Sequence, residues 1–249
     1  MIVSDNIKCL AEMLAGGGVV FFGGAGVSTE SGIPDYRSEN GLYAAKQDYG
    51  RSPEELLSHT CYANEPELFF KYYRENLLTF DVNPNAAHLA LAELERRGLL
   101  NAVVTQNVDG LHQAAGSVNV YELHGSRHRP YCVKCGAKYT REYMINYPET
   151  ITRCEKCGGI VRPDVVLYEE GLDDAVVEGA VSHIRHAKTL IIGGTSLAVY
   201  PAAGLLRYFK GKNLVLINKG ATPYDDEAHL AIHEPIGEVF AAAMEVLGD

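Results

Sequence analysis

The chain has 249 residues, of which 47% are hydrophobic and 22% are charged, and its formal net charge at pH 7 is −10. No apolar run reaches the roughly 20 residues that a membrane-spanning helix needs, and the negative charge disfavours unaided binding to nucleic acid or to anionic membranes. The amino terminus lacks the basic start and long apolar stretch of a signal peptide. We therefore expect a globular, cytoplasmic protein with no direct nucleic-acid partner and no membrane partner.

The first predicted element is a buried strand over Val19 to Phe22, which runs directly into the turn Gly24-Ala25-Gly26. Glycines take backbone angles closed to other residues and let main-chain N–H groups approach a pyrophosphate, while Ser28 or Thr29 can cap a helix that follows. The turn lacks the third glycine of the dinucleotide fingerprint at its usual spacing. A glycine turn built for packing alone therefore stays an alternative.

Further along the chain, short β-branched runs alternate with helical patterns. The predicted strands are Val19 to Phe22, Ala102 to Thr105, Val118 to Leu123, Val165 to Leu167, Thr189 to Ile192 and Leu214 to Ile217. The predicted helices are Ala86 to Arg97, Asp173 to His186, Pro201 to Phe209 and Ile236 to Leu247. This repetition predicts an α/β fold with a doubly wound, parallel, Rossmann-like sheet that holds its ligands at the carboxyl ends of the strands.

Two stretches interrupt the alternation. Residues 35–83 include an aromatic helical segment from Leu68 to Leu77, and residues 126–159 contain four cysteines. We interpret both as insertions that together form a smaller lobe, made of a helical module and a four-cysteine zinc ribbon. The predicted domains are residues 1–34, 84–125 and 160–249 for the Rossmann-like domain, and residues 35–83 and 126–159 for the small lobe.

The four cysteines are arranged as two Cys-x-x-Cys pairs, Cys132 with Cys135 and Cys154 with Cys157. This spacing is typical of a zinc ribbon, in which four thiolates close a tetrahedral site around one structural Zn²⁺. Two disulfides are the alternative. They fit badly with the isolated Cys9 and Cys61 in a chain without a secretory signal.

Polar residues follow several predicted strands, where a parallel sheet places its site. Gln106, Asn107 and Asp109 come after one strand, and His124 comes after the next. The first three can form hydrogen bonds with ribose hydroxyls and an amide, and His124 can exchange a proton near neutral pH. Helix capping or turn closure is the alternative for any one of these segments.

Taken together, these motifs resemble those of the sirtuins, the NAD-dependent protein deacylases, in the family's order and over essentially the full chain. The matching segments are Gly24 to Ser28, Gly32 to Arg37, Gln106 to Asp109, Leu123 to Gly125, the four cysteines, Arg162 to Val166, Gly194 to Ser196 and Val199 to Pro201.

The resemblance implies NAD as co-substrate, one structural Zn²⁺ and acyl-lysine proteins or peptides as partners, and we expect a monomer. The residues that it implies for NAD binding are Gly24, Ala25, Gly26, Ser28, Thr29, Asp35, Tyr36, Arg37, Gln106, Asn107, Val108, Asp109, His124, Gly194, Thr195, Ser196, Asn218, Lys219 and Ile236. The implied catalytic residues are His124, Asn107 and Asp109. The implied substrate contacts are Val165, Val166, Leu167, Tyr168, Leu197 and Val199.

The implied reaction transfers the acetyl group of acetyl-lysine to ADP-ribose and releases nicotinamide. His124 would be the general base that removes a proton from a ribose hydroxyl, while Asn107 and Asp109 position the ribose and the leaving nicotinamide. Three alternatives stay open: transfer of ADP-ribose to a protein acceptor, removal of other neutral acyl groups, and NAD-dependent binding without catalysis.

Three positions depart from the family pattern. Tyr36 stands where Phe is usual, and Glu169 replaces a Gly beside the expected peptide cleft, which predicts a preference for basic residues flanking the acyl-lysine. Tyr73 and Asn76 align with a Tyr and an Arg of sirtuins that remove acidic acyl groups, and loss of that Arg favours neutral acyl groups.

Arg127, beside the cysteines, is expected to have a solvated or capping role.

Overall fold

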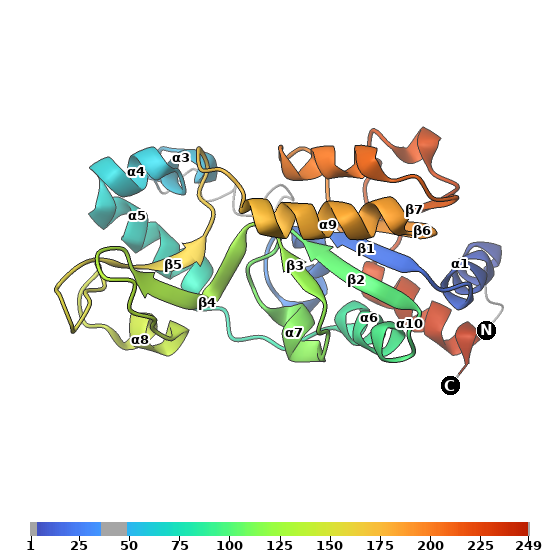
Figure 1. Cartoon of the computed structure of the whole chain (residues 1–249), viewed down its shortest axis with the longest axis horizontal. Helices are drawn as coiled ribbons and strands as arrows, with labels where there is room; N and C mark the ends of the chain where they lie inside the picture. Colours follow the sequence, from blue (N-terminus) through green and yellow to red (C-terminus); the bar gives the residue numbers. More distant parts are fainter. Residues whose placement is uncertain (1–3, 36–48, 249) are drawn as a thin grey trace.

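The computed structural model describes residues 4–35 and 49–248 (Figure 1). Within this part of the chain, six strands form one parallel sheet in the order β3-β2-β1-β6-β7-β8. The strands are β1 (Val19–Gly23), β2 (Leu100–Thr105), β3 (Val120–Glu122), β6 (Thr189–Gly193), β7 (Asn213–Ile217) and β8 (Leu230–Ile232). The strand order reverses beside β1, because β2 lies on one side of it and β6 on the other. The predicted doubly wound parallel sheet is therefore confirmed.

Helices cover both faces of the sheet, so the central strands are buried on both sides. Val19 and Phe21 of β1 pack with one set of helices, whereas Val20 and Phe22 pack with another, because side chains alternate along a strand. The first face carries α1 (Asp5–Ala15), α6 (Ala86–Arg96) and α10 (Ile236–Leu247), with α7 (Leu111–Ala115) against α6. The second face carries α9 (Asp174–His186) and the 3₁₀ helix η5 (Ala202–Tyr208).

Polar residues fix where several of these helices begin. The side chains of Ser4, Asn85 and Asp173 accept hydrogen bonds from backbone N–H groups in the first turns of α1, α6 and α9. Such caps satisfy N–H groups that have no partner within the helix.

A smaller lobe lies beside the sheet, at the left of Figure 1. Its elements are α3 (Pro53–Leu56), α4 (His59–Asn64), α5 (Pro66–Tyr73), the π-helix η4 (Arg74–Leu78), β4 (Gly125–Cys132), α8 (Arg141–Asn146) and β5 (Val161–Val165). Strands β4 and β5 pair in antiparallel fashion. Aromatic side chains of α5, two of the four cysteines and Val161 share one buried cluster, so the helical and cysteine-bearing segments pack around a common core.

Several elements differ from the sequence-based expectation. Val165 to Leu167 is not a strand of the main sheet: β5 ends at Val165 and pairs with β4, because the chain returns from the cysteine segment alongside Gly125–Cys132. The strand expected over Val118 to Leu123 is shorter, since Val118 is 88% exposed. The helix expected from Pro201 is a 3₁₀ helix. Elements α1, α7, β4 and β8 were not predicted.

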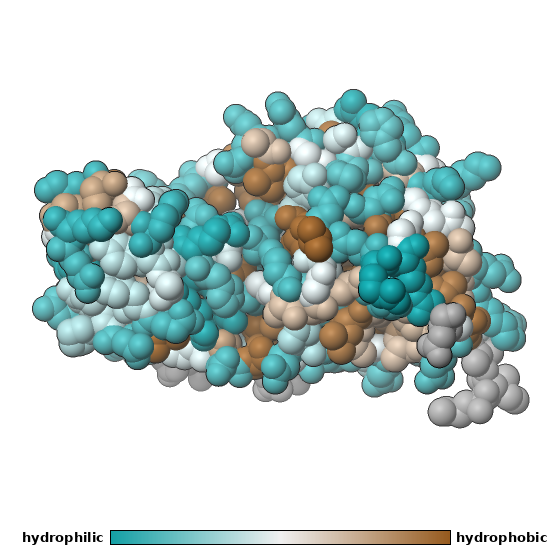
Figure 2. Space-filling view, turned by 60° about the horizontal axis from the view of Figure 1, so that its bottom comes forward, coloured by the Kyte–Doolittle hydropathy of each residue, from teal (hydrophilic) through white to brown (hydrophobic). Residues whose placement is uncertain are grey.

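The surface turned to the viewer in Figure 2 is mostly hydrophilic, with hydrophobic residues in small separate groups. No helix in residues 4–35 or 49–248 is long and apolar enough to cross a membrane.

Candidate active site

A cavity of about 620 Å³ lies where the carboxyl ends of β1, β2, β6 and β7 face the small lobe. Every predicted NAD residue within the described ranges lines it, whereas Tyr36 and Arg37 lie outside those ranges. The lining residues from this set are Gly24, Ala25, Gly26, Ser28, Thr29, Asp35, Gln106, Asn107, Val108, Asp109, His124, Gly194, Thr195, Ser196, Asn218, Lys219 and Ile236. A cleft of this size at the strand-order reversal is the usual ligand site of a doubly wound sheet.

The glycine turn after β1 has a different physical reason from the one expected. Gly24 and Gly26 do not need positive φ. A side chain at either would collide with the loop after β6, at 2.8 Å from Thr195 Cβ and 2.8 Å from Gly194 Cα respectively. The two loops are also joined by a hydrogen bond of 2.8 Å from the N–H of Gly26 to the carbonyl of Gly194.

Ser28 and Thr29 also behave differently from the expected helix caps. The short 3₁₀ helices η1 (Ala25–Val27) and η2 (Thr29–Ser31) have no side-chain cap. Thr29 Oγ1 donates instead to the carbonyl of Gly26 at 2.9 Å, and Ser28 Oγ donates to Asp109 Oδ2 at 2.7 Å. The hydroxyl of Ser28 is therefore a partner of the polar loop after β2.

That loop forms a closed network of hydrogen bonds. Asn107 Nδ2 donates to the carbonyl of Gly24 and to Ser28 Oγ, both at 3.1 Å, and Asp109 Oδ1 accepts from the N–H of Leu111 at 2.9 Å. Asp109 is 8% exposed and Ser28 is 1% exposed, so these bonds are shielded from water. The network holds Asn107 and Asp109 in fixed orientations at the cavity wall.

His124 lies in the short connection between β3 and β4, directly before Gly125, and lines the same cavity. Its Nδ1 is 2.9 Å from the backbone carbonyl of Gln106, and because a carbonyl can only accept, Nδ1 must carry the proton. The neutral ring then has Nε2 as its basic nitrogen. Burial lowers the pKa of His124, although the hydrogen bond to Gln106 opposes this shift. The ring is therefore neutral at pH 7 and able to act as a base.

The loops after β6 and β7 supply the other end of the cavity. Thr195 Oγ1 accepts a hydrogen bond from Gln106 Nε2 at 3.2 Å and another from the N–H of Leu197 at 3.2 Å. Leu197 was expected to contact the substrate, but it does not line the cavity. Its side chain is 5% exposed and packs in the core on the second face of the sheet. Val199 does line the cavity.

The segment from Val165 to Tyr168 lines the cavity between the two lobes. The backbone of Tyr168 is already paired with the helical module, because its N–H donates to the carbonyl of Leu57 at 3.1 Å and its carbonyl accepts from the N–H of His59 at 2.9 Å. The N–H of Val166 donates to the carbonyl of His124 at 2.9 Å. This segment therefore connects the predicted base to helix α4.

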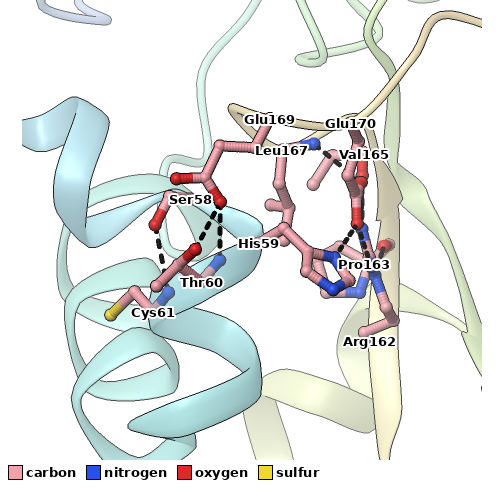
Figure 3. Close-up of polar contacts among 10 residues, drawn as sticks. All are labelled: Ser58, His59, Thr60, Cys61, Arg162, Pro163, Val165, Leu167, Glu169 and Glu170. Atoms are coloured by element: carbon pink, nitrogen blue, oxygen red, sulfur yellow. Dashed lines mark hydrogen bonds and ion pairs between the residues drawn. The ribbon is translucent and has the colours of Figure 1, made fainter.

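The two glutamates that follow Tyr168 point in different directions (Figure 3). Glu169 has a left-handed φ of 77°, and its carboxylate accepts from the N–H and Oγ1 of Thr60 at 2.9 and 2.7 Å. Glu170 pairs with Arg162 through two hydrogen bonds of 2.8 and 3.0 Å and also contacts His59. Although burial opposes the shift, these partners lower the pKa of Glu170 to about 2.

The four cysteines form a cluster away from the cavity. All four Sγ atoms lie within 4.8 Å of one another, and the pairs Cys132–Cys157 and Cys135–Cys154 are 3.5 and 3.7 Å apart. A tetrahedral ion about 2.3 Å from each sulfur would separate the sulfurs by about 3.8 Å, so the cluster fits Zn²⁺ closely. None of the four lines the cavity, which suits a structural metal.

Three side chains at the small-lobe end differ from the sequence-based expectation or had none. Arg127 was expected to be solvated or to cap a helix. It is not solvated, because it is 4% exposed and lines the cavity, but its NH1 donates to the carbonyl of Leu77 at 3.2 Å, near the end of η4. Asn76 donates to the carbonyl of Tyr72 at 3.0 Å. Arg74, two residues before it, donates to the carbonyl of Thr150 at 2.9 Å. Neither side chain lines the cavity. No local sequence pattern around Arg127 indicates that its side chain is buried at the cavity. That placement follows only from the position of β4.

A Rossmann-like sheet with this polar cavity and a closed four-cysteine module defines a nucleotide-dependent enzyme with a structural zinc site. Residues 24–201 match the model of the Sir2 family. The chain is 59% identical over 240 residues to an NAD-dependent protein deacetylase of Clostridium acetobutylicum, which covers 96% of this chain and 98% of that protein. It is 54% identical to one of Clostridium perfringens, which covers 98% and 100%.

Among solved structures, a Sir2 protein with a deacetylated p53 peptide and 3'-O-acetyl ADP ribose matches with a TM-score of 0.87 and 36% identity, over 96% of this chain and 97% of that one. The chain belongs to the Sir2 family. It is an enzyme of the class of NAD-dependent protein deacetylases, with NAD as co-substrate.

Proposed function

We propose that the chain removes acetyl groups from lysine side chains of proteins, with His124 as the general base. The supporting observation is the hydrogen bond between Nδ1 of His124 and the carbonyl of Gln106, which leaves Nε2 as the nitrogen able to accept a proton. NAD supplies an electrophilic ribose carbon when nicotinamide leaves, and the acetyl group ends on ADP-ribose. A protein nucleophile is not required, and His124 takes the proton of a ribose hydroxyl.

Asn107 and Asp109 hold the nicotinamide ribose and the leaving group in this proposal. Their support is the network through Ser28 and Gly24, which fixes both side chains before NAD binds. Preorganised polar groups of this kind lose little entropy on binding. Val108, whose carbonyl accepts from the N–H of Arg127 at 3.0 Å, forms the wall next to them.

The remaining cofactor contacts follow the order of the loops. The turn Gly24 to Thr29 receives the pyrophosphate, with Asp35 close by, and the loops after β6 and β7 receive the adenosine half. Thr195, Ser196, Asn218, Lys219 and Ile236 are the residues of that second half.

The peptide substrate lies against Val165, Val166 and Val199. Because the N–H and carbonyl of Tyr168 already bind Leu57 and His59, Tyr168 contributes its side chain rather than its backbone. Leu197 supports the loop from the core and does not touch the peptide.

We propose that the enzyme works as a monomer in the cytoplasm. Four thiols that hold zinc must stay reduced, and a reducing compartment keeps them so. Size-exclusion chromatography with light scattering measures the molar mass in solution, and a mass of twice 27.2 kDa or more would contradict the monomer.

The test of the activity follows three species by mass spectrometry during incubation of an acetyl-lysine peptide with and without NAD. We expect equal amounts of deacetylated peptide, nicotinamide and acetylated ADP-ribose, and none without NAD. Nicotinamide release with the acetyl group retained and ADP-ribose on protein would instead establish a transferase. No turnover by a zinc-loaded, NAD-binding protein would establish a binding protein.

A further inference from the structure

Strand β4 carries a bulge where it passes the loop after β2. It pairs with β5 up to Ser126 and again from Tyr131 onward, with a register shift between the two stretches. Residues 127–130 therefore lie opposite a single residue, Pro163, which has no N–H to offer to a partner strand. A bulge of this kind bends a strand and redirects its side chains, and bulges are frequent beside active sites.

The bulge contacts the loop that carries Asn107 and Asp109. The N–H of Arg127 donates to the carbonyl of Val108 at 3.0 Å. His128 Nε2 lies 2.7 Å from the carbonyl oxygen of Asp109, and because a carbonyl can only accept, this nitrogen carries a proton and donates it. Two successive carbonyls of the loop between β2 and α7 are thus bound by two successive residues of the bulge.

The imidazole of His128 also packs against the backbone of Gly110. Gly110 has a left-handed φ of 75°, and a Cβ atom added to it would lie 2.8 Å from Cδ2 and 3.0 Å from Nε2 of the ring. The ring therefore covers the peptide unit directly after Asp109. The N–H of His128 donates to Ser126 Oγ at 3.2 Å, which fixes where the side chain leaves the strand. Both the backbone and the ring of His128 are held in place, although the residue is exposed.

Asp109 is thereby fixed at three points. Its two carboxylate oxygens accept from Ser28 and from the N–H of Leu111, and its carbonyl accepts from His128. The first two bonds set the direction of the carboxylate, and the third sets the tilt of the peptide unit that follows it. His124 lies directly before β4, so one strand of the small lobe positions both the proposed base and the polar loop beside it.

We propose that His128 is a positioning residue of the active site, which holds the loop of Asn107 and Asp109 in the orientation that receives the nicotinamide ribose of NAD. This inference deepens the proposed function and rests on it. His128 does not line the cavity, so it acts through Asp109 and takes part in no bond change. Without its hydrogen bond the loop must be ordered when NAD binds, and that cost weakens the binding of NAD.

Two variants separate the hydrogen bond from the ring. His128→Phe keeps an aromatic ring against Gly110 but has no donor, whereas His128→Gln places an amide N–H near the position of Nε2. For His128→Phe we expect kcat/KM for NAD to fall by about 3- to 10-fold, the range that one hydrogen bond supports, with a parallel rise in the Kd for NAD measured by calorimetry. The KM for the acetyl-lysine peptide should stay within about 2-fold of the wild-type value, and His128→Gln should recover most of the loss.

Arg129→Gln is the matched control. Arg129 belongs to the same bulge, but its side chain pairs with Glu122 and Asp164. This variant should leave kcat/KM for NAD unchanged. Amide hydrogen exchange of residues 107–111 in the NAD-free protein gives a readout that does not depend on turnover, and exchange should be faster in His128→Phe and unchanged in Arg129→Gln.

The outcomes separate this inference from the proposed function. If the wild type deacetylates and His128→Phe keeps its kcat/KM for NAD, the positioning role is wrong and the deacetylase stands. Equal losses in His128→Phe and His128→Gln would assign the effect to the shape of the ring and would also overturn the role of the hydrogen bond. A wild type that binds NAD without deacetylating the peptide would contradict the proposed function, while NAD affinity and hydrogen exchange would still decide the role of His128.

Discussion

The hydroxyl of Ser28 donates a hydrogen bond of 2.7 Å to the carboxylate of Asp109, across 81 positions of sequence. It joins the loop after β1 to the loop after β2, and both side chains are buried. Asn107 donates to the same hydroxyl, so one oxygen connects two of the proposed catalytic residues.

Ser28→Ala should therefore destabilise the fold by about 1–3 kcal/mol, because Asp109 Oδ2 loses its donor in a buried place. We also expect the KM for NAD to rise. Ser31→Ala is the matched control, since Ser31 Oγ is buried without a hydrogen-bond partner among the described residues. Chemical denaturation of both variants is the measurement, and equal stability of the two would contradict the role of the Ser28 bond.

His124→Ala should fold with zinc bound and lose roughly 10²- to 10⁴-fold in kcat, the usual range for a general base. In the wild-type enzyme, burial lowers the pKa of His124, so activity should persist below pH 6.5 before protonation removes the base. Steady-state kinetics across pH 5 to 8 measure both effects, with the exposed His186→Ala as control. Retained turnover in His124→Ala would remove the assignment.

Stability should fall with acid because of two neighbouring buried histidines, whose rings are tilted by 58° to each other. His88 and His112 are fully buried with ring centroids 4.7 Å apart, and burial lowers their pKa values to about 4 and about 3. The unfolded chain binds these protons near pH 6.5, so the free energy of unfolding is highest above that pH and decreases as pH falls through it. Each neutral histidine contributes a slope of up to about 1.4 kcal/mol per pH unit.

The check compares urea unfolding of the wild type with His112→Phe between pH 5 and 7. Phe keeps a ring of similar size but has no titratable group. It also removes the two ring nitrogens of His112, which have no hydrogen-bond partner among the described residues. The slope should decrease in the variant. The charge of Asp109 raises the pKa of His88 against the larger effect of burial, and it acts in both proteins. Identical slopes would exclude His112 as a source of the acid sensitivity.

Removal of zinc should disorder the small lobe before the sheet. Cys132 and Cys154 belong to the buried cluster of that lobe, and none of the cysteines lines the cavity. Cys154→Ser is expected to lose metal and turnover while the sheet keeps its circular dichroism, and Cys9→Ser should keep both metal and activity. Metal content by mass spectrometry is compared between the two variants. A Cys154→Ser variant that is free of metal but fully active would contradict a structural role of the metal.

Glu169 tests the expected preference for basic flanking residues. Its carboxylate is exposed at the cavity and is bound to Thr60, which lowers its pKa. Glu169→Gln should reduce kcat/KM for acetyl peptides with flanking Lys or Arg relative to peptides with flanking Asp or Glu. Thr60→Val frees the carboxylate without removing its charge and should keep the preference. Equal turnover of both peptides by the wild type would refute the idea.

The sheet was predictable because its strands carry their own signal. Runs such as Val19 to Phe22 and Thr189 to Ile192 are mostly β-branched or aromatic, are buried on both faces and are followed by glycine. Most of the predicted cavity residues were recognisable for a related reason: they stand just after a strand, as Gly24 and Gln106 do, and the order of their motifs resembles that of one family. The zinc ligands needed only their spacing.

The small lobe was less predictable because its pairings depend on distant segments. Strand β4 contains Arg127, His128 and Pro130 and lacks an alternating apolar pattern, so only its pairing with β5 defines it. The positions of Arg127 and Leu197 depend on that lobe and on a left-handed turn at Leu197, respectively. Neither can be seen in local sequence.

The contact between Gly26 and Gly194 limits how the cofactor site could be redesigned. A methyl group on Gly194 would come within 2.3 Å of the backbone nitrogen of Val27, so the loops after β1 and β6 fit together with no spare volume. Lengthening or exchanging one loop displaces the other, and with it both proposed ends of the dinucleotide. An engineered change of cofactor would therefore have to graft the two loops as one unit.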